Sequence, residues 1–259
     1  MNTSTSPITI TALIRTFWDY STLRASLESI QGVFDDIVVL YHENDEETKR
    51  ILLEVQELYR LRLIPYSPPI HISPSDTDKT KHHDYIQFLA DYAEFGRQQV
   101  STKYFVNIDT DQIYFTEELK KAVWYVKKYD KRVILLGFNL YYKDNTYCID
   151  TQNPINWKWW DSMIVKKDDV YFAPGWTYEV KVFKDRFWRW KKFFTKRFFV
   201  WTHWQQFRRP NRLTTLKTFS PIDSLKDFSF PIPFFSYNSK KKYYQERMQK
   251  SIRLLEKYL

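Results

Sequence analysis

Apolar residues follow two different periods along the first 140 positions of the chain. Short apolar runs, rich in β-branched residues, predict buried strands at residues 8–14, 36–41, 61–66, 103–108 and 133–139. Between these runs, apolar residues recur every three or four positions, which predicts amphipathic helices at residues 19–31, 48–61, 84–99 and 117–128. Strands that alternate with helices are typical of an α/β fold with a mainly parallel sheet flanked by helices.

The pattern changes after residue 140. Segments become shorter, aromatic and mixed in polarity, and they predict hairpins or an irregular extension of the sheet. Residues 186–209 are dense in Phe, Trp, Lys and Arg, and residues 210–237 are interrupted by proline. Residues 239–259 predict a basic amphipathic helix. An aromatic and basic C-terminal extension therefore follows the α/β part.

Composition narrows the classes of function. The 259 residues are 43% hydrophobic and 27% charged, which suits a globular protein with a sizeable core. Only 4 residues are glycine and no glycine-rich phosphate motif occurs, so a phosphate would have to be held in another way. The single cysteine, Cys148, excludes an intramolecular disulfide framework and a multi-cysteine zinc site.

The sequence shows no signal for export or for membrane insertion. The N-terminal residues lack a basic segment followed by an apolar stretch, and no apolar run approaches the roughly 18 residues of a membrane span. We therefore expect a cytoplasmic protein. The net charge is +9, with most acids in residues 1–120 and clustered Lys and Arg in residues 181–259. That distribution indicates an anionic partner, which could be a membrane surface, a nucleic acid or a charged substrate.

The strongest chemical signal is the sequence VNIDTDQIYF. It places Asp109 and Asp111 directly after the fourth predicted strand. Ligands of open parallel sheets bind at the carboxyl ends of the strands, and two carboxylates there can hold a hard divalent cation that bridges a diphosphate. The motif therefore indicates a metal and diphosphate site, although the same pattern is common in surface loops.

With these motifs in place, the first 140 residues resemble the nucleotide-binding half of GT-A glycosyltransferases, especially the family 2 type. The likeness rests on three segments, ITITALIRTF, DIVVLYHENDEET and FGRQQVSTKYFVNIDTDQIYF. It implies a GT-A (Rossmann-like) fold, a nucleotide-sugar donor, a saccharide or glycolipid acceptor, and Mn²⁺ or Mg²⁺ as cofactor. It also implies a division into a nucleotide-sugar-binding half at residues 1–140, an acceptor-binding half at 141–237 and a basic C-terminal helix at 238–259.

The resemblance also assigns residues to the donor site. Near the nucleotide it implies Arg15 and Thr16, and Arg97 on the helix before the D-x-D strand. Glu43 or Asp45 would contact the base or ribose, although these acids could equally form a solvated loop that caps the next helix. Asp109 would contact ribose or metal, and Asp111 would bind the metal. The family often has Pro-x-Tyr-Asn after its first strand, where this chain has Arg-Thr-Phe.

Two further roles remain open in the sequence. An inverting transferase needs a general base, and the candidates are Glu179 first and Asp161 second, followed by Asp168 and Asp169. Glu179 follows two aromatic residues in APGWTYEV, which suits sugar stacking, but it could also be an ordinary surface residue of a strand. His203 in VWTHWQQF is a candidate third metal ligand, or a histidine packed between two tryptophans.

The resemblance implies a metal-dependent glycosyltransferase, which we expect to be inverting in mechanism and to act in bacterial surface polysaccharide or lipooligosaccharide synthesis. Residues 186–209 and 239–259 could contact an anionic membrane peripherally, at its inner face, or could be packed helices. One alternative is a haloacid dehalogenase-like phosphohydrolase, but that class has D-x-D after its first strand. The other is a basic nucleic-acid-binding protein, for which no recognition motif is present, so we expect no nucleic acid partner.

Overall fold

The computed structural model describes residues 7–16, 20–68, 79–143, 146–150, 155–156, 162–175, 179–191, 194–204, 219–221 and 237–258. Four parallel strands in the order β3-β2-β1-β4 form the first half of its main sheet. The strands are β1 (Ile10–Arg15), β2 (Asp36–His42), β3 (Leu61–Tyr66) and β4 (Tyr104–Asp109). The helices are α1 (Tyr20–Ile30), α2 (Glu46–Tyr59), α3 (Lys79–Gln99) and α4 (Thr116–Tyr129). The predicted α/β alternation is confirmed.

Beyond β4 the sheet becomes mixed. Strand β9 (Met163–Lys166) runs antiparallel to both β4 and β6 (Val133–Lys143), and so joins the two halves. Strand β12 (Arg197–His203) lies parallel to β6 and antiparallel to β5 (Gln112–Tyr114). The remaining strands at this end are β7 (Thr146–Asp150), β8 (Ile155–Asn156) and β13 (Phe219–Pro221). The sheet extension predicted after residue 140 is therefore present.

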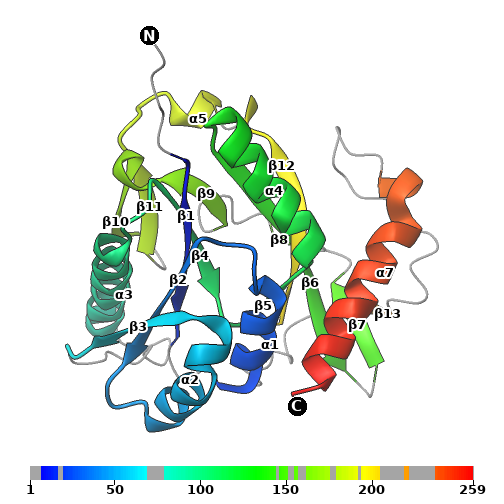
Figure 1. Ribbon diagram of the computed structural model, residues 1–259, viewed down its shortest axis with the longest axis horizontal. Coiled ribbons are helices and arrows are strands. Elements are labelled where there is room, and N and C mark those ends of the chain that lie inside the picture. Colours follow the sequence, from blue (N-terminus) through cyan, green and yellow to red (C-terminus); the bar gives the residue numbers. More distant parts are fainter. Residues whose placement is uncertain are drawn as a thin grey trace.

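Helices cover both faces of the sheet (Figure 1). Side chains alternate along β1, so Ile10, Ala12 and Ile14 share one apolar cluster with α1, α2 and α4. Leu13 points to the other face and joins a cluster that includes Ala93 of α3. A separate hairpin of β10 (Val170–Pro174) and β11 (Glu179–Phe183) lies beside α3, preceded by the short helix η1 (Lys167–Asp169).

The C-terminal helix α7 (Tyr237–Glu256) is part of the core. Its Tyr244 ring packs against Phe138 of β6 and Phe199 of β12, with centroid distances of 5.5 and 5.6 Å. The basic residues of α7 therefore lie on a helix that is already anchored by its apolar face. No helix in the described part of the chain is both long enough and apolar enough to cross a membrane. The division of the chain after residue 140 stays a prediction.

Two expectations about secondary structure need correction. Helix α3 begins at Lys79, five residues before the start at residue 84 that the apolar spacing predicts. The aromatic and basic stretch is not one helix, because α5 covers only Trp188–Lys191 and residues 197–203 form β12. Phe, Val, Trp and Thr favour strands, and here β6 provides a neighbouring strand with which to pair.

Candidate functional site

The C-terminal edge of the parallel strands brings together the ends of β1 and β4. Arg15 and Asp109 are the last residues of the two strands and are paired in register. The Arg15 guanidinium Nη2 lies 3.6 Å from Asp109 Oδ1, and the side chains are 12% and 29% exposed. A cation and a carboxylate therefore meet where a parallel sheet usually binds its ligand.

Asp111 lies in the turn between β4 and β5, and β12 brings His203 to it. The antiparallel pairing of β5 and β12 sets His203 opposite Gln112. As a result, His203 Nε2 lies 3.2 Å from Asp111 Oδ2, and the Asp111 side chain is only 2% exposed. The Trp204 amide donates a hydrogen bond to the Asp111 carbonyl at 2.8 Å, which fixes the turn to the end of β12.

Asn139 of β6 completes this arrangement, because its Oδ1 lies 3.2 Å from His203 Nδ1. With Nδ1 donating to Asn139, a neutral His203 turns the lone pair of Nε2 toward the Asp111 carboxylate. Two electron-rich atoms at 3.2 Å require a proton or a cation between them. Ligands of a hard cation with bonds of about 2.1 Å are spaced by about 3 Å, so the pair also fits neighbouring positions around a metal ion.

Asp109 faces a different set of partners. Gln112 Nε2 lies 3.3 Å from Asp109 Oδ2, and the Tyr114 hydroxyl donates to Gln112 Oε1 at 2.7 Å. Burial, together with the charges of Asp109 and Asp111, raises the pKa of Tyr114 well above its ordinary value, so this hydroxyl stays protonated. Tyr114 thus orients the Gln112 amide, and Gln112 in turn orients the Asp109 carboxylate.

The candidate metal ligands are close in pairs but do not form one cluster. Among the residues that the structure describes, no group of three or more His, Cys, Asp and Glu side chains is arranged to hold a metal ion. Asp111 and His203 supply two adjacent donors, while Asp109 is engaged by Arg15 and Gln112. These residue types are suited to Mn²⁺ or Mg²⁺, which take oxygen donors and tolerate imidazole.

Thr16 follows Arg15 and is held at the junction of β1 and β2. Its amide donates to the Leu40 carbonyl at 3.0 Å. The hydroxyl of Tyr92, from α3, lies 2.9 Å from the Thr16 carbonyl and 2.8 Å from the Leu40 carbonyl. Thr16 is fully buried, so it supports the position of Arg15 and is not itself an exposed surface for a ligand.

The acidic loop after β2 divides its two candidate residues between different roles. Asp45 is 3% exposed and caps α2, because its Oδ1 accepts a hydrogen bond from the Thr48 amide at 3.2 Å. Glu43 is exposed at the same edge of the sheet as Arg15. The capping alternative is therefore the observed one for Asp45, and Glu43 is the carboxylate of this loop that faces solvent.

Arg97 does not join the site, which corrects its assignment to the nucleotide. It lies at the end of α3, next to the start of β4, at the opposite edge of the sheet. Its guanidinium pairs with Glu94 at 2.5 Å and donates to the Lys167 carbonyl at 3.1 Å. Asp169 belongs to the same edge, where it lines a cavity with Tyr104, so it also lies away from Asp109.

The two favoured general bases cannot be placed by their side chains. Asp161 lies outside the described residues, and only the backbone of Glu179 is described. Glu179 begins β11 opposite Pro174, at the end of the hairpin away from Val170 and η1.

Sequence reasoning missed Asn139, Gln112 and Tyr114, although the first two left a signal. Asn139 interrupts the apolar run VILLGFN, and Gln112 follows the D-x-D directly. A polar residue within an otherwise buried strand must find a hydrogen-bond partner, and here the partners are His203 and Asp109.

Comparison with known proteins gives two results. A family model described as Beta-1,4-N-acetylgalactosaminyltransferase (CgtA) matches residues 2–253. Among solved structures, S. aureus TarS 1–349 in complex with UDP is similar, with 12% identity, a TM-score of 0.48, and coverage of 76% of this chain and 60% of that one. Its complex with UDP-GlcNAc is similar as well, with 13% identity, a TM-score of 0.47, and coverage of 76% of this chain and 58% of that one. The chain thus spans about three fifths of those structures. No curated protein sequence matches it.

Proposed function

The chain belongs to the β-1,4-N-acetylgalactosaminyltransferase (CgtA) family, and on that basis we propose that it transfers N-acetylgalactosamine from a nucleotide-sugar to a saccharide or glycolipid acceptor. Its strand order β3-β2-β1-β4, continued by antiparallel β9 and by β6, is the GT-A arrangement expected for such an enzyme. The observation that carries the proposal is the presence of two pairs, Asp109 with Arg15 and Asp111 with His203, at the C-terminal edge of that sheet.

In the proposed site, the donor diphosphate lies across the ends of β1 and β4. Arg15 supplies a fixed positive charge there, since it is held by Asp109 and lies over the Phe172 ring at 5.9 Å. Asp111 and His203 would hold Mn²⁺ or Mg²⁺, with Asn139 fixing the histidine tautomer. The bound cation would offset the negative charge that develops on the departing nucleoside diphosphate.

The proposed reaction is inverting, and its base acts on the acceptor hydroxyl. Glu179 remains the first candidate because its strand starts at the end of the hairpin away from η1, and Asp161 remains the second. A surface polysaccharide or lipooligosaccharide is the proposed acceptor. Such an acceptor would be membrane-bound, so the proposal includes peripheral contact between the enzyme and the anionic inner face of the membrane.

Asp111→Asn tests the proposal directly. Asparagine keeps the shape of the side chain but removes its charge, so binding of UDP-N-acetylgalactosamine that depends on Mn²⁺ should be lost while the fold is retained. Isothermal titration with and without Mn²⁺ measures the binding, and circular dichroism checks the fold. Asp169→Asn, at the opposite edge of the sheet, is the matched control and should bind normally. Unchanged Mn²⁺-dependent binding in Asp111→Asn would refute the proposed site.

A further inference from the structure

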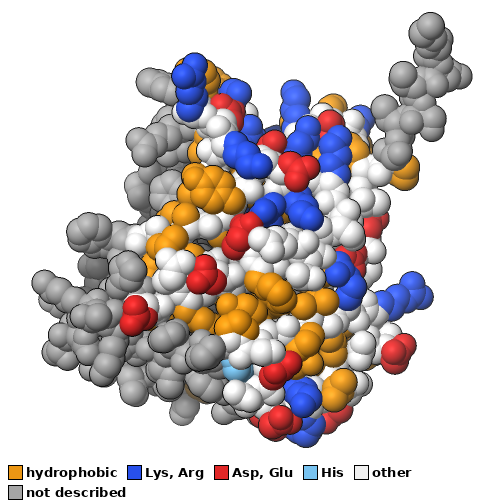
Figure 2. All heavy atoms as spheres, turned by 90° about the vertical axis from the view of Figure 1, so that its left-hand side faces the viewer, with side chains coloured by type: hydrophobic (Ala, Val, Ile, Leu, Met, Phe, Trp, Pro, Cys, Tyr) orange, Lys and Arg blue, Asp and Glu red, His pale blue; other side chains and the backbone are white. Residues whose placement is uncertain are grey.

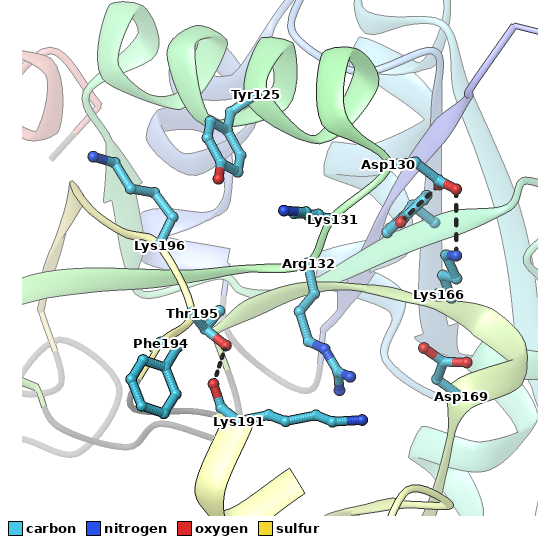
Figure 3. Close-up of a pocket in the computed structure, with 11 residues that line it drawn as sticks. Tyr125, Asp130, Lys131, Arg132, Lys166, Asp169, Lys191, Phe194, Thr195 and Lys196 are labelled. Carbon is cyan, nitrogen blue, oxygen red and sulfur yellow. Dashed lines mark hydrogen bonds and ion pairs between the residues drawn. The ribbon is translucent and has the colours of Figure 1, made fainter.

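A basic cavity of about 280 Å³ opens at the N-terminal edge of the sheet, away from the proposed site. Figure 3 shows that its lining comes from the end of α4 and the start of β6, from β9 and η1, and from the segment after α5. Tyr104 lines the cavity and is the first residue of β4, whereas Asp109 is the last. The cavity and the proposed catalytic site therefore lie at opposite ends of one strand.

Positive charge exceeds negative charge in this cavity. Five of its lining residues are basic and two are acidic. Asp130 is already engaged by Lys103 at 2.9 Å and Lys166 at 3.4 Å, and these contacts, Lys103 first, hold its pKa below the ordinary value. The surplus makes the cavity suited to an anionic group.

Three of the basic side chains in the lining differ in the partners that they contact. Arg132 lies over the Trp188 ring at 4.8 Å, and its guanidinium is 3.6 Å from Asp185. Lys131 and Lys196 are exposed and form no ion pair with any residue that the structure describes. These two lysines are therefore the cations most available to an external anion.

Exposed aromatic residues surround the same end of the molecule. Phe194, beside the cavity, is 90% exposed, and Phe187, before α5, is 55% exposed. Trp124 on the last turns of α4 is also 55% exposed and carries Lys128 over its ring at 4.5 Å. Figure 2 shows Lys and Arg side chains gathered at the upper end of the molecule, where Figure 1 places α5. Phe194 thus lies among the basic residues of the cavity, and Phe187 lies one helical turn before Lys191 of the same lining.

We propose that this basic face, formed by Lys131, Arg132, Phe187, Lys191, Phe194 and Lys196, docks on an anionic membrane. The lysines would hold lipid phosphate in and around the cavity, and the two phenylalanines would enter the boundary between headgroups and acyl chains. An exposed phenylalanine ring is stabilised when it leaves water for the apolar part of a bilayer, and a small soluble anion would leave it exposed. The two rings therefore favour a bilayer over a small anion as the partner of this face. The proposal gives a surface to the membrane contact proposed above and does not depend on the transfer chemistry.

Vesicle co-sedimentation tests this surface. Vesicles of phosphatidylglycerol and phosphatidylethanolamine should bind the unaltered protein at low salt and release it as salt rises, whereas phosphatidylcholine vesicles should not bind it. Lys131→Glu with Lys196→Glu should weaken binding by about tenfold or more. Lys242→Glu with Lys250→Glu, an equal charge change at exposed positions of α7, should bind nearly as well as the unaltered protein. Phe194→Ser should weaken binding without changing net charge.

Three results would overturn the proposal. The first is equal binding by the Lys131/Lys196 pair variant and the α7 pair variant, whether both are retained or both are lost. The second is salt-sensitive affinity for single-stranded DNA that matches the affinity for vesicles. The third is release by inorganic phosphate when sodium chloride of equal ionic strength releases nothing, which would indicate a site for a free anion.

The transfer reaction provides an independent readout. With a soluble saccharide acceptor, the Lys131/Lys196 pair variant should turn over normally, while Asp111→Asn should still bind vesicles. Failure of membrane docking and failure of the proposed transferase site are therefore distinguishable.

Discussion

Gly137→Ala should both destabilise the protein and disturb the proposed site. Gly137 lies on β6 in register with Trp201 of β12, whose indole ring crosses directly above the glycine. A Cβ atom at position 137 would stand 2.1 Å from Cδ2 and Cε3 of the ring and 2.5 Å from Cζ3. Carbon atoms in contact are normally about 3.5–4.0 Å apart, so the ring or the strand must move by more than about 1 Å.

The loss of stability expected for Gly137→Ala follows from the position of the Trp201 ring in the core. Trp201 is 1% exposed and belongs to the core cluster beneath α4, so it has no open space to enter. Overpacking in a closed core costs about 1–3 kcal/mol, and we expect a value at the upper end. Relief by moving β12 would shift His203, two residues further on, whose contact with Asp111 is 3.2 Å.

Guanidinium unfolding of a double-mutant cycle measures the effect. Trp201→Val alone removes packing and should cost about 3 kcal/mol or more. In the Trp201→Val background, adding Gly137→Ala should cost at least about 1 kcal/mol less than in the native background, since the clash is gone. Gly96→Ala is the control, because the atoms nearest to its Cβ belong to flexible Leu side chains at 3.2–3.3 Å. A fully additive cycle, or a Gly137→Ala variant as stable as the native protein, would refute the reasoning.

Three other predictions concern the site and its support. Asn139→Leu should weaken Mn²⁺ affinity by about 10–100-fold in isothermal titration, since it removes the partner that fixes the histidine tautomer; unchanged affinity would contradict this. Glu179→Gln should lower turnover by about 10²–10⁴-fold with near-normal donor affinity. If Glu179→Gln turns over normally and Asp161→Asn is slow, Asp161 is the base. Burial raises the pKa of Glu94, but hydrogen bonds led by Arg97 outweigh it and leave the pKa below its ordinary 4.5. The ionised Glu94 carboxylate therefore contributes stability above pH 4.5, and that contribution is lost as the pH falls through the pKa of the folded state. On acidification, the urea midpoint of Glu94→Gln should decline less than that of the native protein.

Local pattern predicted the parallel half of the fold well. The runs that became β1, β2, β3 and β4 are apolar on both faces because helices cover both sides of the sheet, and such runs stand out in a sequence. The position of Asp109 and Asp111 at a strand end followed from the same pattern. Arg15 was assigned to the nucleotide by the resemblance to GT-A glycosyltransferases, and it lies beside Asp109 because the parallel strands β1 and β4 end at one edge of the sheet.

Long-range pairing could not be predicted in the same way. His203 reaches Asp111 only because β12 inserts between β5 and β6, although these strands are separated from it by more than 50 residues. Arg97 was misplaced since α3 runs antiparallel to the strands, which carries its last turn to the edge opposite the site. A residue's distance from a motif along the chain did not indicate which edge of the sheet it would occupy.

Strand β4 has a consequence for the length of the acceptor. Its first residue lines the basic cavity and its last lies in the proposed catalytic site, five steps of about 3.3 Å apart, or roughly 16 Å. With β4 standing upright on the bilayer, an enzyme that rests on lipid through the cavity would hold its reacting centre at about that height above it. It would then glycosylate the outer sugars of a long oligosaccharide and pass over those next to the membrane, so that the length of one strand would set the minimum size of its substrate.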